Sequence, residues 1–241
     1  IGLYDLHSQI NAWMKSLNNW LLVLSVLSCF GCSSPVHEDD RGCAFVSDSI
    51  QYRVEFMSAG CVRILSFPEG DTLVTRRLVV DSEKPAFKDY KWEDTGQKLL
   101  FRTRELSVVF DKADVAFTFQ ETSTGKLLLK EKGDRKARNF KRSVAGGEQC
   151  LEVTQCFVPT EDEAIYGLGQ YQNGIMNYRG KSVLLLQANM DIVNPFLIST
   201  NGYGVLWDNY SSTKFEDTKE GYSFTSEVGD ASDYYFVYGK N

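Results

Sequence analysis

Histidine, the side chain that most often performs acid–base and metal chemistry near neutral pH, is almost absent from this sequence. Its two copies are His7 and His37, and none follows Gly42. Ser-His-Asp and Cys-His nucleophile arrangements need a histidine, and so do histidine-based zinc sites. The sequence from Gly42 onward excludes these mechanisms, and we expect neither a metal nor a cofactor.

Cysteine offers a second kind of chemistry, with six copies in the chain. Cys150 and Cys156 lie six residues apart on one expected strand, which separates them by about 20 Å. A disulfide cannot span that distance. Pairings that include Cys43 or Cys61 remain open, but free thiols are the favoured state.

An apolar segment near the start resembles an export signal. Met14 and Lys15 precede the run WLLVLSVLSCF, residues 20–30, which ends in small residues and is shorter than the about 20 residues of a membrane span. We predict a signal peptide over 14–32 and upstream translated sequence over 1–13. The alternative is a buried amphipathic helix.

The end of this segment is similar to the lipobox of bacterial lipoproteins, where a cysteine after a small residue is lipidated. The candidates are Cys29, in VLSC, and Cys32, in FGC. Residues 33–44 then form a polar, acidic tether like that of Bacteroides surface lipoproteins. This resemblance implies a periplasmic or outer-membrane lipoprotein of a Gram-negative bacterium that touches the membrane only through its lipid. Plain secretion is the alternative.

Composition describes an ordinary globular protein, with 43% hydrophobic and 24% charged residues. A length of 241 residues can form one large domain or two small ones. The formal charge of −6 lacks the basic footprint that nucleic-acid binding demands, so we expect no nucleic-acid partner.

From residue 45 onward the chain reads as short strands separated by turns. Apolar and polar residues alternate with period two in runs such as CVRILSF and VAFTFQ, which is typical of half-buried strands. No stretch after residue 42 keeps a helical period for three turns. The pattern predicts an all-β fold, a large antiparallel β-sandwich over 45–241. The expected strands are 50–56, 61–67, 72–80, 98–103, 106–110, 115–120, 127–131, 151–158, 164–168, 183–187, 195–199, 204–209, 213–217, 222–225 and 233–238.

One stretch interrupts the strands. Arg135 to Gly147 is basic and ends in glycines. We predict a solvated loop there.

Three segments, in this order, resemble the N-terminal domain of glycoside hydrolase family 31, which contains α-glucosidases and α-xylosidases. They are IYGLGQ at 165–170, YRGK at 178–181 and NPFLISTNGYGVLWDN at 194–209. The resemblance covers about residues 45–241 and implies a galactose mutarotase-like supersandwich. Departures exist, because many members have Glu where this chain has Gln170.

The resemblance also points to substrate-binding residues. Many members carry an Asn-Arg-Asp stretch on a loop over the first sugar subsite. Here the corresponding stretch, LQANMD, is more similar to the Gln-x-Asn form of α-xylosidase-like members. Gln187 and Asn189 can hydrogen-bond sugar hydroxyls through their planar amides, and Asp191 either joins them or caps a turn.

Aromatic side chains near this stretch offer flat faces to a sugar. Phe196 is expected in the core, whereas Tyr203 and Trp207 are open between core and sugar contact.

The family mechanism is retaining hydrolysis by two aspartates of a (β/α)₈ barrel. The Trp-x-Asp-Met-Asn-Glu type motif of the first is absent here, so we expect no catalytic residue in a chain that stops before the barrel. The expected partners are an oligosaccharide and that barrel in the full-length enzyme. Alternatives are a stand-alone surface carbohydrate-binding lipoprotein and a sugar mutarotase; the missing histidine argues against the latter.

Overall fold

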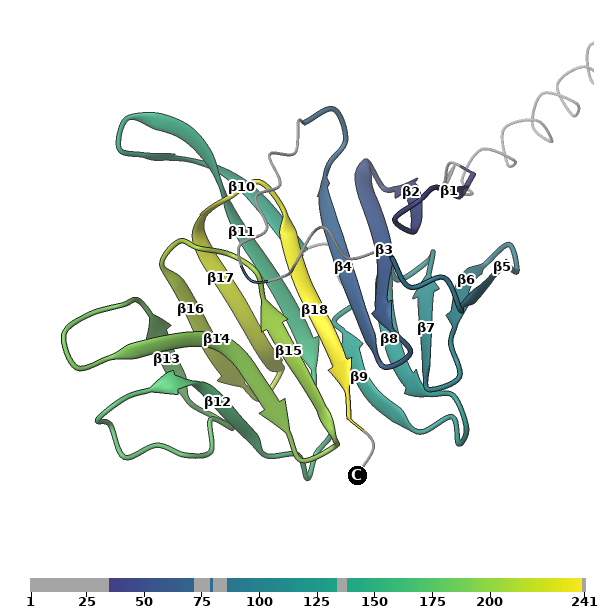
Figure 1. The fold of residues 1–241 in the computed structure, drawn as a ribbon. Coiled ribbons are helices and arrows are strands. Elements are labelled where there is room, and N and C mark those ends of the chain that lie inside the picture. Colours follow the sequence, from purple (N-terminus) through teal and green to yellow (C-terminus); the bar gives the residue numbers. More distant parts are fainter. Residues whose placement is uncertain (1–34, 72–78, 80–85, 134–137, 240–241) are drawn as a thin grey trace, which may run out of the picture. The chain divides into compact units, whose positions relative to one another are not determined.

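Two antiparallel β-sheets make up the regular structure of the described part of this protein (Figure 1). The computed structural model describes residues 35–71, 79, 86–133 and 138–239, which belong to the compact unit Ser33–Asn241. All the regular elements in these ranges are strands, which confirms the all-β prediction. We find no helix there with the length and hydrophobicity that a membrane span requires.

The first sheet, here sheet A, has eight strands and combines both ends of the described chain. Strand β18 lies at its centre, between β4 and β15. In pairing order the strands are β1 (His37–Glu38), β2 (Cys43–Ser47), β3 (Ile50–Ser58), β4 (Cys61–Pro68), β18 (Ser232–Tyr238), β15 (Tyr203–Trp207), β14 (Ile192–Ser199) and β12 (Ile165–Gln170).

The second sheet, sheet B, has ten strands. Its two outer strands are β13 and β5, which therefore lie at opposite edges (Figure 1). In pairing order the strands are β13 (Ser182–Leu185), β16 (Thr213–Thr218), β17 (Gly221–Gly229), β11 (Glu148–Val158), β9 (Leu127–Glu131), β8 (Ala116–Glu121), β7 (Leu106–Asp111), β6 (Lys98–Arg102) and β5 (Lys91–Asp94), with β10 (Arg138–Ala145) also paired to β11.

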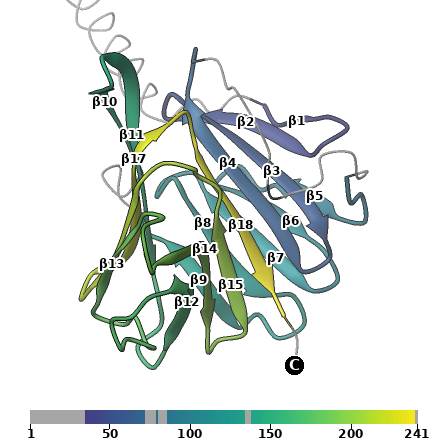
Figure 2. The same cartoon turned by 60° about the vertical axis from the view of Figure 1, so that its left-hand side comes forward.

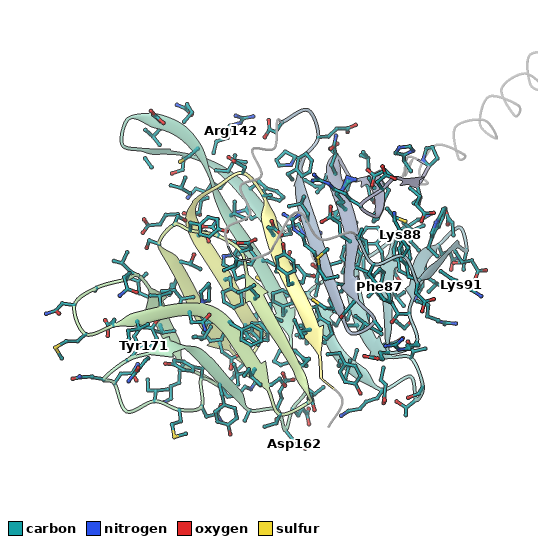
Figure 3. All side chains as sticks on the ribbon, in the orientation of Figure 1. Phe87, Lys88, Lys91, Arg142, Asp162 and Tyr171 are labelled. Carbon is teal, nitrogen blue, oxygen red and sulfur yellow. The ribbon has the colours of Figure 1, made fainter. Side chains whose placement is uncertain are left out.

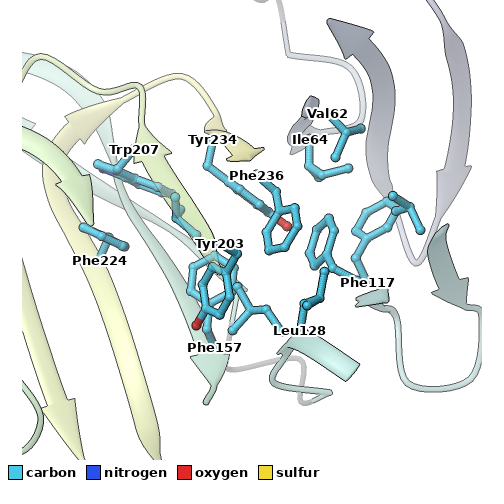
Figure 4. Close-up of a cluster of buried hydrophobic side chains, with 14 of the residues drawn as sticks. Val62, Ile64, Phe117, Leu128, Phe157, Tyr203, Trp207, Phe224, Tyr234 and Phe236 are labelled. Atoms are coloured by element: carbon cyan, nitrogen blue, oxygen red, sulfur yellow. The ribbon is translucent and has the colours of Figure 1, made fainter. Parts of the chain in front are cut away.

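The sheets face each other across an aromatic core (Figures 2 and 4). Phe119 of sheet B stacks on Phe236 of sheet A with ring centroids 4.2 Å apart. Trp207 of sheet A lies parallel to Phe224 of sheet B at 5.4 Å. These cross-sheet pairs confirm the predicted sandwich, because flat side chains from two inner faces interdigitate in such a core.

Most of the predicted strands exist, with ends shifted by a few residues. The alternation was informative because each such strand buries one face, as in β17, where every second residue from Tyr222 to Ser226 is buried. The predicted strand at 72–80 lies outside the described residues, apart from Val79.

The predicted loop at 135–147 is wrong for its described part. Arg138–Ala145 is strand β10, which pairs with β11 from Arg138 opposite Gln155 to Ala145 opposite Glu148. Both faces of β10 are largely solvated, so no apolar alternation marks it. Gly146 and Gly147 form its two-residue turn with φ angles of 59° and 86°, a conformation that glycine adopts without strain.

The start of the described chain also differs from expectation. Within the stretch predicted as a tether, His37–Glu38 forms β1 and pairs with Cys43–Ala44 at the start of β2. One of the two histidines therefore lies in the sheet. The predicted signal peptide and its cysteines, Cys29 and Cys32, lie outside the described residues.

The four cysteines of the described chain are free thiols, as predicted: Cys43, Cys61, Cys150 and Cys156.

Candidate functional site

The loop Gln187–Asp191 connects β13 at the edge of sheet B to β14 in sheet A. The Gln187 amide closes this loop, because its Nε2 donates to the Asp191 carbonyl at 2.7 Å and its Oε1 accepts from the Val193 backbone N–H at 3.2 Å. The Asp191 N–H also donates to the Ala188 carbonyl at 3.3 Å. Gln187 therefore shapes the loop and uses both ends of its amide to do so.

Asn189 occupies the exposed tip of this loop. Its side chain makes no hydrogen bond to the described residues, so both its donor and its acceptor are available to a ligand. The neighbouring Met190 is 61% exposed and has a φ of 71°, which marks the tightest point of the turn. Of the three predicted residues, Asn189 has the geometry of a ligand-binding group.

Asp191 lies at the base of the loop and is half-buried. Its charge acts on Tyr171, which follows β12 (Figure 3) and donates to the Leu168 carbonyl at 3.0 Å. The pKa of Tyr171 is raised to about 12, most strongly by burial and further by the nearby Tyr178 and Asp191. Asp191 therefore belongs to the support of the loop.

The motif IYGLGQ forms β12 and orients the loop through a bulge. Gly167, Leu168 and Gly169 all have positive φ, and the register against β14 shifts between the two glycines. A Cβ at Gly169 would overlap the carbonyl oxygen of Ile192, so only glycine fits this close approach. The bulge brings Gln170 opposite Ile192, the first residue after the loop.

A cavity of about 380 Å³ adjoins the loop. The end of β13, the start of β14 and the connection after β15 form its walls. The lining residues are Val79, Leu185, Leu186, Gln187, Val193, Asn194, Pro195, Leu206, Trp207, Asp208, Asn209, Tyr210, Ser211, Ser212 and Thr213.

Asp208 is the one carboxylate among the described residues of this lining, and sequence reasoning did not select it. Its Oδ1 atom is buried without a hydrogen-bond partner among the described residues. An unpartnered buried acceptor costs free energy, and this oxygen is closed to solvent in the structure. Its position directly after Trp207, at the end of a strand, was the available signal.

The connection after Asp208 is rigid. Asn209 Nδ2 donates to the Val228 carbonyl at 3.0 Å, and Asn209 Oδ1 accepts from Ser211 N and Ser211 Oγ, each at 2.8 Å. The cavity wall that carries Asp208 is therefore held in place by its own side chains.

Tyr203 and Trp207, left open by the sequence, are core residues. Both are at most 2% exposed, and Trp207 donates its indole N–H to Ser226 Oγ at 2.9 Å. Phe196, expected in the core, is partly exposed and packs its ring over Gly204 of the next strand. None of the three offers a free aromatic face to a sugar inside this cavity.

A chain of buried charges crosses sheet A close to this site. Arg63 donates to both carboxylate oxygens of Asp233 and, at 3.0 Å, to Glu55. Arg53 pairs with Glu55 and with Asp39. Although burial opposes it, the carboxylates of Asp233 and Glu55 hold the pKa of Arg63 above its ordinary value. The backbone carbonyl of Asp233 also accepts a hydrogen bond from the Asp208 N–H at 2.9 Å.

Within the described residues, no three His, Cys, Asp or Glu side chains cluster in a way that could hold a metal ion.

Comparison with known proteins assigns this architecture to a protein family. Residues 51–216 match the family described as the glycosyl hydrolase 31 N-terminal galactose mutarotase-like domain. The chain belongs to this family. The match includes the bulged strand β12, the loop Gln187–Asp191 and all the described residues that line the cavity.

Individual family 31 relatives agree with this assignment. An α-xylosidase of Saccharolobus solfataricus is 32% identical over 206 residues, which is 79% of this chain. The crystal structure of a family 31 α-xylosidase from Xanthomonas citri is 30% identical with a TM-score of 0.64, over 76% of this chain and 20% of that one. An α-xylosidase from a soil metagenome, solved with xylose, shares the fold at 22% identity and a TM-score of 0.69, over 86% of this chain and 33% of that one.

The chain spans 26% of the length of the Saccharolobus α-xylosidase.

Proposed function

We propose that this family 31 domain is the non-catalytic N-terminal sandwich of an α-glycosidase that hydrolyses α-linked xylose or glucose in oligosaccharides. Two relatives described above are named α-xylosidases, which supports this substrate class. Retaining hydrolysis needs two carboxyl groups about 5–5.5 Å apart. Among the described residues, this cavity lining holds one carboxylate, Asp208, and not the pair that the chemistry needs, which supports assigning the chemistry to another domain.

The loop Gln187–Asp191 is the part of the sandwich that reaches the substrate. The observation that carries this proposal is the free amide of Asn189 on a loop that Gln187 and the bulge of β12 hold in one conformation. A pre-shaped loop binds without the entropic cost of ordering it. The carboxylate-bearing residue Asp208 lines the cavity that adjoins this loop.

The catalytic barrel of the full-length enzyme is the proposed partner of this edge. Apolar side chains are exposed on both sides of the loop, and contiguous exposed apolar surface marks interaction sites. These side chains are Leu184, Leu186, Met190 and Ile192.

The test is a kinetic comparison in the full-length enzyme. Asn189→Ala should lower kcat/KM for an aryl α-xyloside or α-glucoside about tenfold or more, as expected for one lost hydrogen bond to the transition state. Asn139→Ala, at an exposed position of β10, is the matched control and should leave kcat/KM unchanged. An unaltered kcat/KM in Asn189→Ala, with the enzyme folded, would show that the loop does not contact substrate.

Export as a lipoprotein is the second part of the proposal. The apolar run before Cys29 and Cys32 supports it. Incorporation of radiolabelled palmitate should be abolished by one of two single changes, Cys29→Ser or Cys32→Ser. The change that abolishes it identifies the lipidated residue. Labelling that survives both single changes and the double change would exclude lipidation at this motif.

A further inference from the structure

The outer surface of the β5–β6 hairpin forms a second concave region, at the sheet B edge opposite to the loop Gln187–Asp191 (Figure 1). Its volume is about 600 Å³. The residues that line it are Asp89, Tyr90, Lys91, Trp92, Glu93, Leu100, Arg102, Thr103 and Arg104.

Two cations face each other in this hollow. Lys91 of β5 (Figure 3) lies directly opposite Arg102 of β6 in the antiparallel register, and both side chains are exposed. Among the described residues, neither makes an ion pair or a side-chain hydrogen bond. Like charges at directly opposed positions destabilise a sheet, so an anion bound between them would relieve the repulsion.

Two lysines elsewhere in the described sheets have an acidic partner directly opposite. Lys98, on the same hairpin, faces Asp111 across the strands and pairs with it at 3.2 Å. Lys141 faces Glu152 in the same way, at 3.7 Å. The fold places carboxylates opposite these lysines but a second cation opposite Lys91.

The inner rim of the hollow is fixed by Glu38. Its two carboxylate oxygens accept from Tyr90 Oη and Trp92 Nε1, each at 2.9 Å. These two bonds, first that of Trp92 and then that of Tyr90, hold the pKa of Glu38 below its ordinary value. Glu38 is thus committed to the aromatic side chains and does not neutralise Lys91 or Arg102.

We propose that this hollow binds an acidic saccharide, one that carries a uronic acid carboxylate. Arg102 and Lys91 bind the carboxylate, since a guanidinium forms two parallel hydrogen bonds with it and an ammonium adds a point charge.

The remaining lining residues suit the rest of such a sugar. Asp89 and Glu93 are exposed acceptors for hydroxyl groups, and Leu100 between them offers an apolar surface to the C–H face of a ring. A simple inorganic anion would gain nothing from these acidic side chains, whereas a hydroxylated acid uses both charge signs.

The experiment is isothermal titration of the full chain with trigalacturonate. Saturable binding is expected, and it should weaken as salt is added because the contacts are exposed charges. The trimethyl ester of the same trisaccharide has the same shape without the charge. Its affinity should be lower by about tenfold or more. No binding at millimolar trigalacturonate, or equal binding of acid and ester, would overturn the proposal.

Variants locate the binding. Arg102→Gln and Lys91→Gln should each reduce affinity about tenfold or more, while Lys98→Gln, on the same hairpin but already paired, should not change it. Trigalacturonate should raise the thermal midpoint of the wild type and not that of Arg102→Gln.

The variants also carry their own folding control. Removing one of two opposed cations relieves repulsion, so Arg102→Gln should unfold at the same temperature as the wild type or higher. Binding that survives both glutamine variants would place the saccharide elsewhere and refute the assignment. These measurements use no catalytic readout, so they stand or fall separately from the proposed α-glycosidase function.

Discussion

Arg63 is a long cation that is 1% exposed on a strand of sheet A. It is tolerated because Asp233 and Glu55, both at most 9% exposed, take up its donors, and because the ring of Tyr235 lies 5.6 Å from its guanidinium carbon. A buried charge is stable only while its partners remain.

Arg63→Leu should therefore lower the free energy of unfolding by about 3–5 kcal/mol, because it leaves the buried Asp233 carboxylate without its cation and Glu55 with Arg53 alone. Urea unfolding followed by tryptophan fluorescence measures this. The comparison is Lys214→Ala, which removes the exposed Lys214–Glu216 pair and should cost less than about 1 kcal/mol. Equal losses of unfolding free energy for the two variants would show that the Arg63 network stabilises the fold no more than an exposed ion pair does.

The thiols of Cys43 and Cys61 give a pH dependence. Burial raises the pKa of each from 9.0 to about 11. The folded state thus holds these protons more tightly than the unfolded chain, so the stability they contribute is complete below pH 9.0 and is lost as the pH rises toward about 11. Cys61→Ala should flatten this alkaline loss of stability, measured by urea unfolding across the same pH window. Parallel pH profiles for the variant and the wild type would contradict the assignment.

Residue types indicated a polar loop but not how each of its side chains is used. The stretch LQANMD was predictable as a polar loop, whereas the use of both ends of the Gln187 amide inside the loop depends on a turn geometry that residue types do not encode. Asp208 was missed for a similar reason, since an unpartnered oxygen becomes visible only when its neighbours are placed.

At the scale of single elements, β12 shows how a short motif positions a distant loop. Its bulge depends on glycine, because Gly169 has a φ of 122° and its backbone touches that of Ile192.

Gly169→Ala should destabilise the fold by more than about 2 kcal/mol, since strain and overlap with backbone add. Gly125→Ala is the control, because Gly125 also has a positive φ, of 72°, but an added Cβ meets no atom within 4 Å; it should cost about 1 kcal/mol. Differential scanning calorimetry distinguishes the two. If the Gly169→Ala protein is as stable as Gly125→Ala, then the close backbone approach at Gly169 does not require glycine.

Strands that bury one face were predictable from their period-two pattern, as for β8 and β17. Strand β10 was not, because most of its side chains are solvated and its inward anchor, Arg138, is polar. That anchor is satisfied by Glu131 and Gln155, partners that only the folded sheet brings within reach. Hydrophobic alternation therefore does not mark solvated strands that polar contacts hold in place.

For the whole molecule, the sequence predicted a sandwich but not the order of its strands. Sheet A closes by pairing β4 with β18, so that Arg63 and Asp233 meet across 170 residues of chain. Such pairings depend on register and burial at long sequence separation, which local patterns do not determine. The same long-range order places the loop Gln187–Asp191 and the β5–β6 hollow at opposite edges of sheet B.

The central claim is that this sandwich supports an α-glycosidase without performing the chemistry. Its most direct test is release of nitrophenol from aryl α-xylosides and α-glucosides by purified residues 33–241, alongside the full-length enzyme under the same conditions. We expect turnover by the full-length enzyme and none above buffer by the sandwich, because retaining hydrolysis needs two carboxyl groups and Asp208 is the one carboxylate among the described residues of its cavity. Measurable turnover by the sandwich alone, abolished by Asp208→Asn, would contradict the account.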